Sequence, residues 1–491
     1  MKSIVRFLSN PKSIYPIIII GMLLRIFFVF VGGKIYFGSS HFFIQADTSS
    51  WFNAFINLWE KGTYTVDLSN ETASFFRPPG YSFEFGIFYL ISFKNIELAS
   101  HMLVVAQMIM DITCIWLIYK IASNVVRNQN EERRKIFCNT SALLFAIYPF
   151  SIVWAPVLYA EASSVFFLLL AVLYGTKQGS SKNIFLCGFF GGIAVLIRLQ
   201  CAFCIPFIML SLFFSNDVLK KKLKRVVVFG FALCLSYGLW PARNIILHHR
   251  VLFSQDLNRG YHWSRDFMSF LDFIYAVRTD HTPVYWQIIK NEKVDWPKEA
   301  YLDPGDSVLL DSAVALCRTC GTGFSYWKMS EGLQGKAVEP SQNCDSAIDN
   351  IFTSLYIKQK KKNAFNYWVT VPLGNLEKCF FKFNLYSNKS YVVKKFSSSL
   401  FLFRTFLILL GLAGIYLALR KKFLKNSFLF LLFSYTIGWY FFLSFFYRNM
   451  EIRYLLQCDV LLLIPASYVI TLLISSIASS TEKSVNEVVH S

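Results

Sequence analysis

Charged residues are scarce in this chain of 491 residues, since Asp, Glu, Lys and Arg together make up only 16% of it. Hydrophobic residues make up 55%, and the mean hydropathy is +0.43. A water-soluble protein of this length carries more charge and less apolar surface. The composition therefore excludes that class and indicates a protein with many membrane spans.

Nucleotide-binding signatures are also missing. The sequence has neither a P-loop nor a glycine-rich turn between a strand and a helix. An enzyme that uses a soluble nucleotide-linked donor would need such a domain, so any donor is expected to come from the membrane. Internal repeats of fixed period are absent as well, and the two halves show no symmetry. Transporters are often built from such repeats, which weakens a transporter interpretation.

Hydrophobic runs of about 17–25 residues can cross a bilayer. We predict an all-α polytopic membrane protein with about ten transmembrane helices. The run 201–215 is short and continuous with the one before it, and 81–93 could form a re-entrant or interfacial helix. The first run lacks a small-x-small cleavage site and is expected to be a retained signal anchor. The ten runs lie near 14–32, 97–121, 137–156, 158–175, 184–200, 201–215, 225–246, 398–420, 426–446 and 455–476.

Basic residues concentrate on one side of these spans. With the N-terminus in the cytoplasm, the cytoplasmic segments hold 20 Lys and Arg but only five Asp and Glu. Lys and Arg accumulate in cytoplasmic loops, so this asymmetry supports the orientation and places both termini in the cytoplasm. The net charge of +19 then reflects membrane topology and requires no nucleic-acid partner. We expect the inner (plasma) membrane in a bacterium and the endoplasmic reticulum in a eukaryote.

One long polar interruption, 247–397, holds 15 of the 30 acidic residues. None of its apolar runs is long enough to span, so we predict an external domain of mixed secondary structure, inserted before the last three spans. The flanking parts are an N-terminal transmembrane module (1–246), whose first external loop is 33–96, and a C-terminal transmembrane module with a cytoplasmic tail (398–491).

Four cysteines in the external segment, Cys317, Cys320, Cys344 and Cys379, could form disulfides in an oxidising compartment, and the pairing is open. Cys317 and Cys320 have CxxC spacing. No second CxxC and no nearby His complete a zinc site, so we predict no metal there.

The charged residues near the span ends converge on the external face. Charges in or near hydrocarbon cost several kcal/mol unless they are paired or face a wet cavity, so a shared external cavity is expected. These residues are Asp47, Arg77, Glu161, Arg198, Arg243, Arg448, Glu451 and Arg453.

The first external loop carries an ordered set of motifs: Asp47 before an aromatic stretch, then Gly62-Thr-Tyr64, then Arg77-Pro-Pro-Gly-Tyr81. This order resembles the first external loop of GT-C glycosyltransferases. The closest resemblance is to the branch of protein O-mannosyltransferases and lipid A aminoarabinose transferases (glycosyltransferase family 39). Later motifs follow in the family's order: Leu158-Tyr-Ala-Glu161, Gly191 to Arg198, Trp240-Pro-Ala-Arg-Asn244 and Arg453-Tyr454.

The resemblance implies a GT-C fold and a membrane enzyme that transfers a sugar from a polyprenyl-phosphate carrier to an external acceptor. The acceptor could be a glycan, a lipid or a protein, and membrane lipids surround the site. Asp47 would be the general base, with inversion at the anomeric carbon. The alternative role for Asp47 is helix capping, because Asp-Thr-Ser-Ser-Trp is typical of a helix start. A lipid or solute transporter with the same cavity is the alternative function.

Arginine binds phosphate bidentately, so the outer arginines are candidates for the donor phosphate. Arg243 and Arg453 come first, followed by Arg77 and Arg198, with Glu161, Tyr81 and Tyr454 lining the cavity. Arg77 could also be an ordinary membrane-surface arginine. Many relatives have a second acid beside the catalytic one, but this chain has Ala46. A paired-carboxylate metal site is therefore in doubt. A divalent metal could bind but is not indicated, and no cofactor is certain.

Aromatic residues at spacings of three and four follow Asp47, from Trp51 to Trp59. Such a face is typical of an interfacial helix at headgroup depth. Ordinary packing against the rest of the protein is the alternative.

Overall fold

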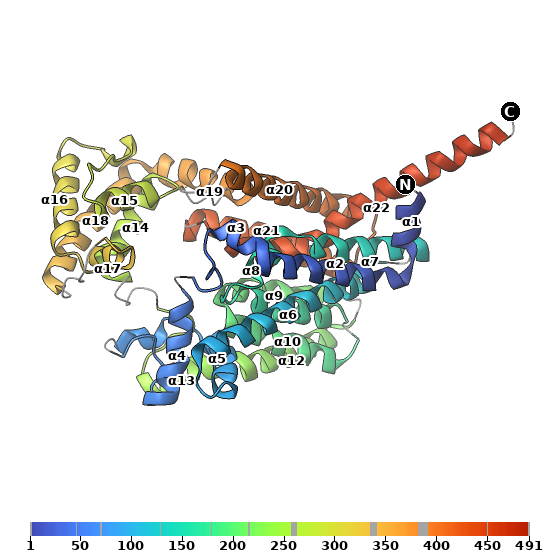
Figure 1. The fold of residues 1–491 in the computed structure, drawn as a ribbon, viewed down its shortest axis with the longest axis horizontal. Helices are drawn as coiled ribbons and strands as arrows, with labels where there is room; N and C mark the ends of the chain where they lie inside the picture. Colours follow the sequence, from blue (N-terminus) through green and yellow to red (C-terminus); the bar gives the residue numbers. More distant parts are fainter. Residues whose placement is uncertain are drawn as a thin grey trace.

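The structure is a computed structural model that describes residues 2–45, 47–68, 71–127, 129–177, 179–214, 217–256, 263–333, 341–381, 391–448 and 450–489. All regular secondary structure in these ranges is helical, apart from one isolated bridge between Val126 and Leu424. The prediction of an all-α fold is confirmed. Long helices run side by side along the longest axis of the molecule, with both termini at one end and helices α14–α18 at the other (Figure 1).

Thirteen α-helices of the described residues precede the external segment. In chain order they are α1 (Lys2–Ser9), α2 (Ile14–Phe27), α3 (Gly33–Phe37), α4 (Thr48–Lys61), α5 (Pro79–Ile91), α6 (Ile96–Val125), α7 (Glu131–Ala146), α8 (Pro149–Trp154), α9 (Glu161–Thr176), α10 (Ser181–Ile197), α11 (Ile205–Ser211), α12 (Leu219–Tyr237) and α13 (Leu239–His248).

The remaining helices build the external segment and the last spans. They are α14 (Arg265–Val277), α15 (Thr282–Ile289), α16 (Gly305–Thr319), α17 (Thr322–Ser330), α18 (Gln342–Lys362), α19 (Val371–Phe381), α20 (Tyr391–Arg420), α21 (Asn426–Phe442) and α22 (Leu456–Val489).

Five helical segments in the described ranges are long and apolar enough to cross a membrane, and α12 with α13 makes a sixth if this pair, bent by 53°, is one span. The predicted number of ten is therefore not confirmed. Three of the other predicted spans coincide with shorter apolar helices, of which α9 has 16 residues and α10 has 17. The predicted span 137–156 divides at Pro149 into α7 and α8, because proline begins a new helix there.

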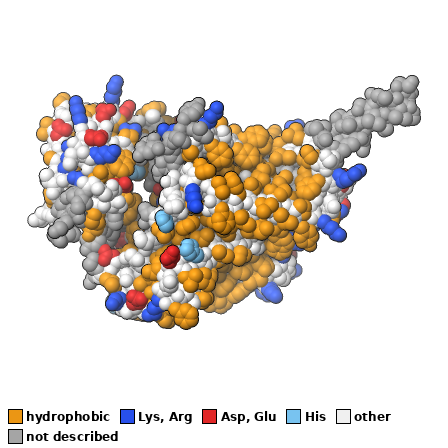
Figure 2. Space-filling model, viewed as in Figure 1, with side chains coloured by type: hydrophobic (Ala, Val, Ile, Leu, Met, Phe, Trp, Pro, Cys, Tyr) orange, Lys and Arg blue, Asp and Glu red, His pale blue; other side chains and the backbone are white. Residues whose placement is uncertain are grey.

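Apolar side chains cover the flank of the bundle, whereas charged side chains gather towards its two ends (Figure 2). Exposed apolar residues of this kind include Phe27, Phe30, Val105 and Ile109 in the first two spans. A water-facing surface of this composition would be unfavourable, so the flank fits a bilayer. The protein is a multi-pass membrane protein.

Two buried ion pairs hold the spans together. Arg25 of α2 pairs with Asp111 of α6, and Arg404 of α20 pairs with Asp459 of α22. Ser151 completes the first pair by donating to Asp111 at 2.6 Å. Removal of one partner from such a pair would leave an uncompensated buried charge, which costs about 3–5 kcal/mol.

The external segment has its own hydrophobic core, formed by buried residues between Phe267 and Leu355. The prediction of mixed secondary structure is wrong for the described part of 247–397, which is helical. A disulfide joins Cys320 to Cys344, while Cys317 and Cys379 are free. Disulfides persist in oxidising compartments, which agrees with an external location. The domain boundaries themselves stay a prediction.

The aromatic face of α4 packs mainly against the protein. Trp51, Phe52 and Phe55 are buried, and the ring of Phe52 stacks on that of Phe85 in α5 at 3.7 Å between centroids. Only Trp59 is largely exposed, at 53%. The packing alternative therefore applies to most of this face, and it fixes the start of α4 beside α5.

Candidate active site

The start of α4 positions Asp47. Thr48, the first residue of the helix, accepts a hydrogen bond from the backbone N–H of Gln45 at 3.0 Å and donates to the carbonyl of Leu158 at 3.2 Å. The backbone N–H of Asp47 donates to the hydroxyl of Tyr159 at 3.2 Å. Asp47 occupies the N-cap position, but its side chain makes no capping bond. The carboxylate is therefore available for other contacts.

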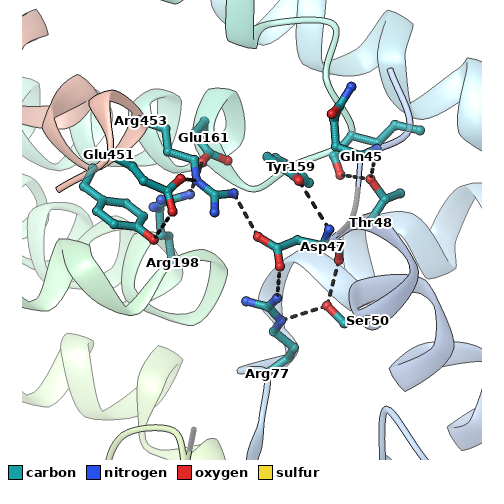
Figure 3. A network of polar contacts seen from close by, with 12 residues as sticks. Gln45, Asp47, Thr48, Ser50, Arg77, Tyr159, Glu161, Arg198, Glu451 and Arg453 are labelled. Atoms are coloured by element: carbon teal, nitrogen blue, oxygen red, sulfur yellow. Dashed lines mark hydrogen bonds and ion pairs between the residues drawn. The ribbon is translucent and has the colours of Figure 1, made fainter. Parts of the chain in front are cut away.

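Two arginines hold the Asp47 carboxylate, one on each oxygen (Figure 3). Nη2 of Arg77 lies 3.0 Å from Oδ1, and Nη1 of Arg453 lies 2.9 Å from Oδ2. The Asp47 side chain is 32% exposed, so it can still be reached from the cavity.

The two arginines determine the protonation of Asp47. Burial alone would raise the pKa of this carboxyl, but the charges of Arg77 and Arg453 and their hydrogen bonds hold the pKa well below its usual range. Asp47 is thus ionised at every physiological pH. It is also a weak base for as long as both arginines hold it.

Arg77 is fixed by its surroundings. Its Nε donates to the hydroxyl of Ser50 at 2.9 Å, and its guanidinium lies 4.6 Å from the ring centroids of both Trp51 and Phe76. Ser50 in turn donates to the backbone carbonyl of Asp47 at 2.7 Å. Arg77 is therefore a fixed partner of the catalytic candidate and not a freely solvated surface arginine.

Arg453 connects Asp47 to two further carboxylates. Its Nε lies 2.6 Å from Glu451 and 3.9 Å from Glu161. Glu161 is fully buried and forms an ion pair with Arg198 at 2.5 Å. The two groups are not aligned as a hydrogen bond. Three guanidinium groups and three carboxylates thus share one network, a charge-balanced arrangement that a phosphate could enter by exchanging partners.

These residues border a cavity of about 230 Å³, which we call the polar cavity. The external segment supplies the side that faces the network. The lining residues are Asp47, Trp51, Phe76, Arg77, Tyr159, Glu161, Arg198, Leu199, Gln200, Gln255, Trp263, Met268, Leu271, Asp272, Tyr275, Tyr447, Glu451, Arg453 and Tyr454.

The structure does not bring Arg243 or Tyr81 to the polar cavity. Arg243 donates to the backbone carbonyls of Tyr64 and Ser74, at 3.0 Å each. Its guanidinium also lies 5.1 Å from the ring of Trp240. Tyr81 is fully buried with its ring against Trp51. The six other predicted site residues all line the polar cavity.

Arg243 borders a second cavity of about 640 Å³, which we call the apolar cavity. Its lining includes Leu58, Phe83, Leu196, Leu239 and Leu247.

The backbone segment 76–80 lies between the two cavities. Phe76 and Arg77 border the polar cavity, whereas Pro79 and Gly80 border the apolar one. A Cβ on Gly80 would come within 2.5 Å of the backbone of Ile197. Only glycine permits this approach, so the Pro-Pro-Gly motif seats the turn against the end of α10.

A resident metal does not fit the donor set. No group of three or more His, Cys, Asp or Glu in the described ranges could hold an ion. Each carboxylate of the network already pairs with an arginine. The residues at the site therefore suit binding of an anion better than binding of a cation.

Several cavity residues were not predicted. Tyr159 is one of them, although it lies inside the motif that ends at Glu161, whereas Glu451 was expected at the shared external cavity and does line it. Trp263, Asp272 and Tyr275 come from the external segment, where no motif indicated a site. Only the folded arrangement of the chain brings them to the cavity that Asp47 also lines.

Comparisons with known proteins give distant likenesses. No protein-family model matches the chain, and neither does any curated protein. Among solved structures, two crystal structures of ArnT from Cupriavidus metallidurans are similar, one bound to undecaprenyl phosphate and one in the apo state. Their identities are 13% and 14%, with TM-scores of 0.35 and 0.32. The matches cover 91% and 90% of this chain and 77% of each ArnT chain. Likeness at this level identifies no family.

Proposed function

We propose that this protein is an integral membrane glycosyltransferase that moves a sugar from a polyprenyl-phosphate carrier to an acceptor at the external face. The observation that carries the proposal is the contact of Asp47 with Arg77 and Arg453 in one cavity. A carboxylate that can accept a proton thus lies beside cations that can bind a leaving phosphate. Glycosyl transfer from a phosphate needs both.

The two cavities match the two parts of such a donor. The apolar cavity has lining suited to an isoprenoid chain, and the polar cavity has charges suited to a phosphate and a sugar. The segment 76–80 borders both cavities, so a donor with its chain in the apolar cavity could place its phosphate near Arg77. A fully soluble donor would have no use for the apolar cavity.

The reaction would proceed by displacement at the anomeric carbon. The acceptor hydroxyl attacks this carbon and gives its proton to Asp47. The bond between the carbon and the phosphate oxygen breaks, and its electron pair leaves with the phosphate. Arg453 and Arg77 would stabilise that charge through their planar forks. Attack opposite the phosphate inverts the anomeric centre.

Donor binding would also adjust the basicity of Asp47. The phosphate competes with this carboxylate for Arg77 and Arg453. Each guanidinium that turns to the phosphate removes part of the charge that depresses the pKa of Asp47. The carboxylate would thus become a better base only when the donor is in place.

The test is turnover of purified Asp47→Asn protein with a synthetic polyprenyl-phosphate hexose. Amide and carboxylate are nearly isosteric, so folding should be kept while transfer falls about 10²–10⁴-fold. Glu97→Gln, which neutralises an exposed carboxylate in the first turn of α6, is the matched control. Near-normal turnover by Asp47→Asn would remove this assignment. Intact-mass comparison of glycans, glycoproteins and envelope lipids with and without the protein would identify the acceptor.

A further inference from the structure

The polar cavity has two unlike walls. The wall from the transmembrane modules carries Arg77, Arg198 and Arg453. A second wall comes from α14 and the residues just before it, and includes Trp263 and Asp272. A phosphate belongs on the first wall. The second wall combines an indole ring with a carboxylate and suits a different chemical group.

The size of the cavity limits what that group can be. Its volume of about 230 Å³ is below the roughly 300–1,000 Å³ that is usual for sites of drug-sized ligands. The space is therefore large enough for a single sugar ring beside the phosphate. A sugar linked to a phosphate on the arginine wall would extend towards α14.

Asp272 is suited to accept hydrogen bonds from such a ring. It is an exposed residue of α14 that lines the cavity. Partial burial and then the negative charge of Asp349 raise the pKa of its carboxyl. A hydroxyl that donates to Asp272 would relieve this unfavourable environment. Such charge-assisted hydrogen bonds are stronger than neutral ones.

Trp263 supplies aromatic surface to the same cavity. Its ring lies 5.8 Å from that of Phe267 and 6.2 Å from that of Trp327, which limit its movement. Aromatic surface with a few placed polar groups is the usual lining of a small-molecule site. One face of a pyranose ring consists of C–H groups and can pack on the indole, while its hydroxyl groups point outwards.

Hydrogen bonds connect the wall formed by α14 to the segment that carries Arg453. Arg448 donates to the carbonyl of Tyr275 in α14 at 3.3 Å and to that of Tyr367 at 2.8 Å. Arg448 belongs to the short connection that also carries Glu451 and Arg453. The spacing between the two walls is thus set by contacts within the protein and not by a flexible linker.

We propose that Trp263 and Asp272 recognise the sugar ring that is transferred, and so select which sugar the enzyme uses. The inference rests on the proposed function, because it assigns the phosphate to the facing arginines. Asp272 accepts a hydroxyl hydrogen bond from the ring, and Trp263 packs against its C–H face. Neither residue takes part in proton transfer.

The experiment compares two probes on the full-length purified protein. One is a polyprenyl-phosphate hexose and the other is polyprenyl phosphate without a sugar, used as a competitive inhibitor. Asp272→Asn should raise the KM for the sugar-bearing donor about 10–100-fold, as expected for a lost hydrogen bond to a charged group. Inhibition by polyprenyl phosphate alone should be unchanged. Trp263→Ala should show the same separation.

Asp349→Asn is the matched control, because Asp349 carries the same charge close to Asp272 but does not line the cavity. Its kinetics should remain those of the unmodified protein. Hexose donors that differ in one hydroxyl group should be ranked by their KM values. This ranking should disappear with Asp272→Asn and remain with Asp349→Asn.

Three outcomes would overturn the inference. The Asp272→Asn protein could use every donor normally, it could lose affinity for polyprenyl phosphate as well, or it could change only the acceptor KM. Failure of the proposed function looks different, because Asp47→Asn would then leave turnover intact. If Asp47→Asn is inactive and Asp272→Asn is unaffected, only the proposal that Trp263 and Asp272 recognise the sugar is rejected.

Discussion

Nη1 of Arg453 lies 2.9 Å from Oδ2 of Asp47, although the two residues are 406 positions apart in the sequence. This contact joins the residues just before α22 to the residue just before α4. A group that competes for Arg453 therefore changes the environment of Asp47 directly.

Replacement of Arg453 should separate charge from geometry. Arg453→Lys keeps the positive charge but loses the planar fork, so donor turnover should fall less than with Arg453→Ala. The alanine variant leaves Glu451 without its arginine, whereas Glu161 keeps Arg198 and Asp47 keeps Arg77. Stability should fall by up to about 3 kcal/mol, since the pair with Asp47 is partly exposed. Donor kinetics and thermal unfolding in detergent are the measurements. Equal turnover of the two variants would contradict a role for the fork.

Arg243→Ala should act mainly on stability. The guanidinium holds the carbonyls of Tyr64 and Ser74, and its loss should cost about 1–3 kcal/mol. Phosphate binding by Arg243, predicted from its motif, requires instead a stable protein with impaired donor binding. Thermal unfolding and donor titration of the same preparation distinguish the two results.

The external domain should become less stable as the pH rises from about 4 to about 6. Burial raises the pKa of Asp266 to about 6, whereas an unfolded Asp titrates near 4. The folded state binds the additional proton in this range, so the stabilisation is present at low pH and is lost as the carboxyl ionises. The change should be roughly 2 kcal/mol between pH 4.5 and 7. Asp266→Asn should flatten this slope in thermal unfolding curves, and an unchanged slope would contradict the assignment.

Loss of the Cys320–Cys344 disulfide should destabilise the external domain. The bridge closes a loop with a sequence separation of 24, for which about 3 kcal/mol is expected. Cys344→Ser should therefore lower the unfolding temperature. Cys317→Ser is a matched control, since Cys317 is a free cysteine of the same domain. Its removal should leave the bridge intact in a thiol count.

Membrane orientation can be tested with membrane-impermeant thiol reagents. A cysteine at the exposed position Lys421 should react only from the cytoplasmic side, and one at the exposed position Glu331 only from outside. Basic residues around 420–425 and acidic residues in 247–397 are the reason for this expectation. The reverse pattern would place Asp47 on the cytoplasmic face and reject the carrier mechanism.

The sequence was informative where charge and hydropathy decide the structure. Helical spans follow from apolar composition, and the family-like motifs indicated that Asp47, Arg77 and Arg453 belong to one site, where the structure brings them into contact. The number of spans was not predictable by this route. An apolar run such as 137–156 reads as one segment, although Pro149 divides it into two helices.

The external side of the polar cavity could not be predicted for a different reason. Trp263 and Asp272 belong to a domain whose helices are held by irregular aromatic packing, as between Phe270 and Phe324. Contacts of this kind have no fixed spacing in the sequence. Arg243 was predicted from a family-like motif to bind phosphate; in the structure it lies outside the polar cavity and donates to two backbone carbonyls, and its role in phosphate binding stays a prediction.

Gly80 lies at the boundary between the two cavities, since it borders the apolar one and Arg77, three residues before it, borders the polar one. A methyl group at this position would press on the backbone of Leu196 and Ile197 and displace the turn from α10. For an amphiphile that straddles this boundary, Gly80→Ala would lengthen the distance between its oily part and its head without altering a single charge. The absence of a side chain at Gly80 therefore keeps the two cavities close together. It limits the distance between the headgroup and the tail of an amphiphile bound in both.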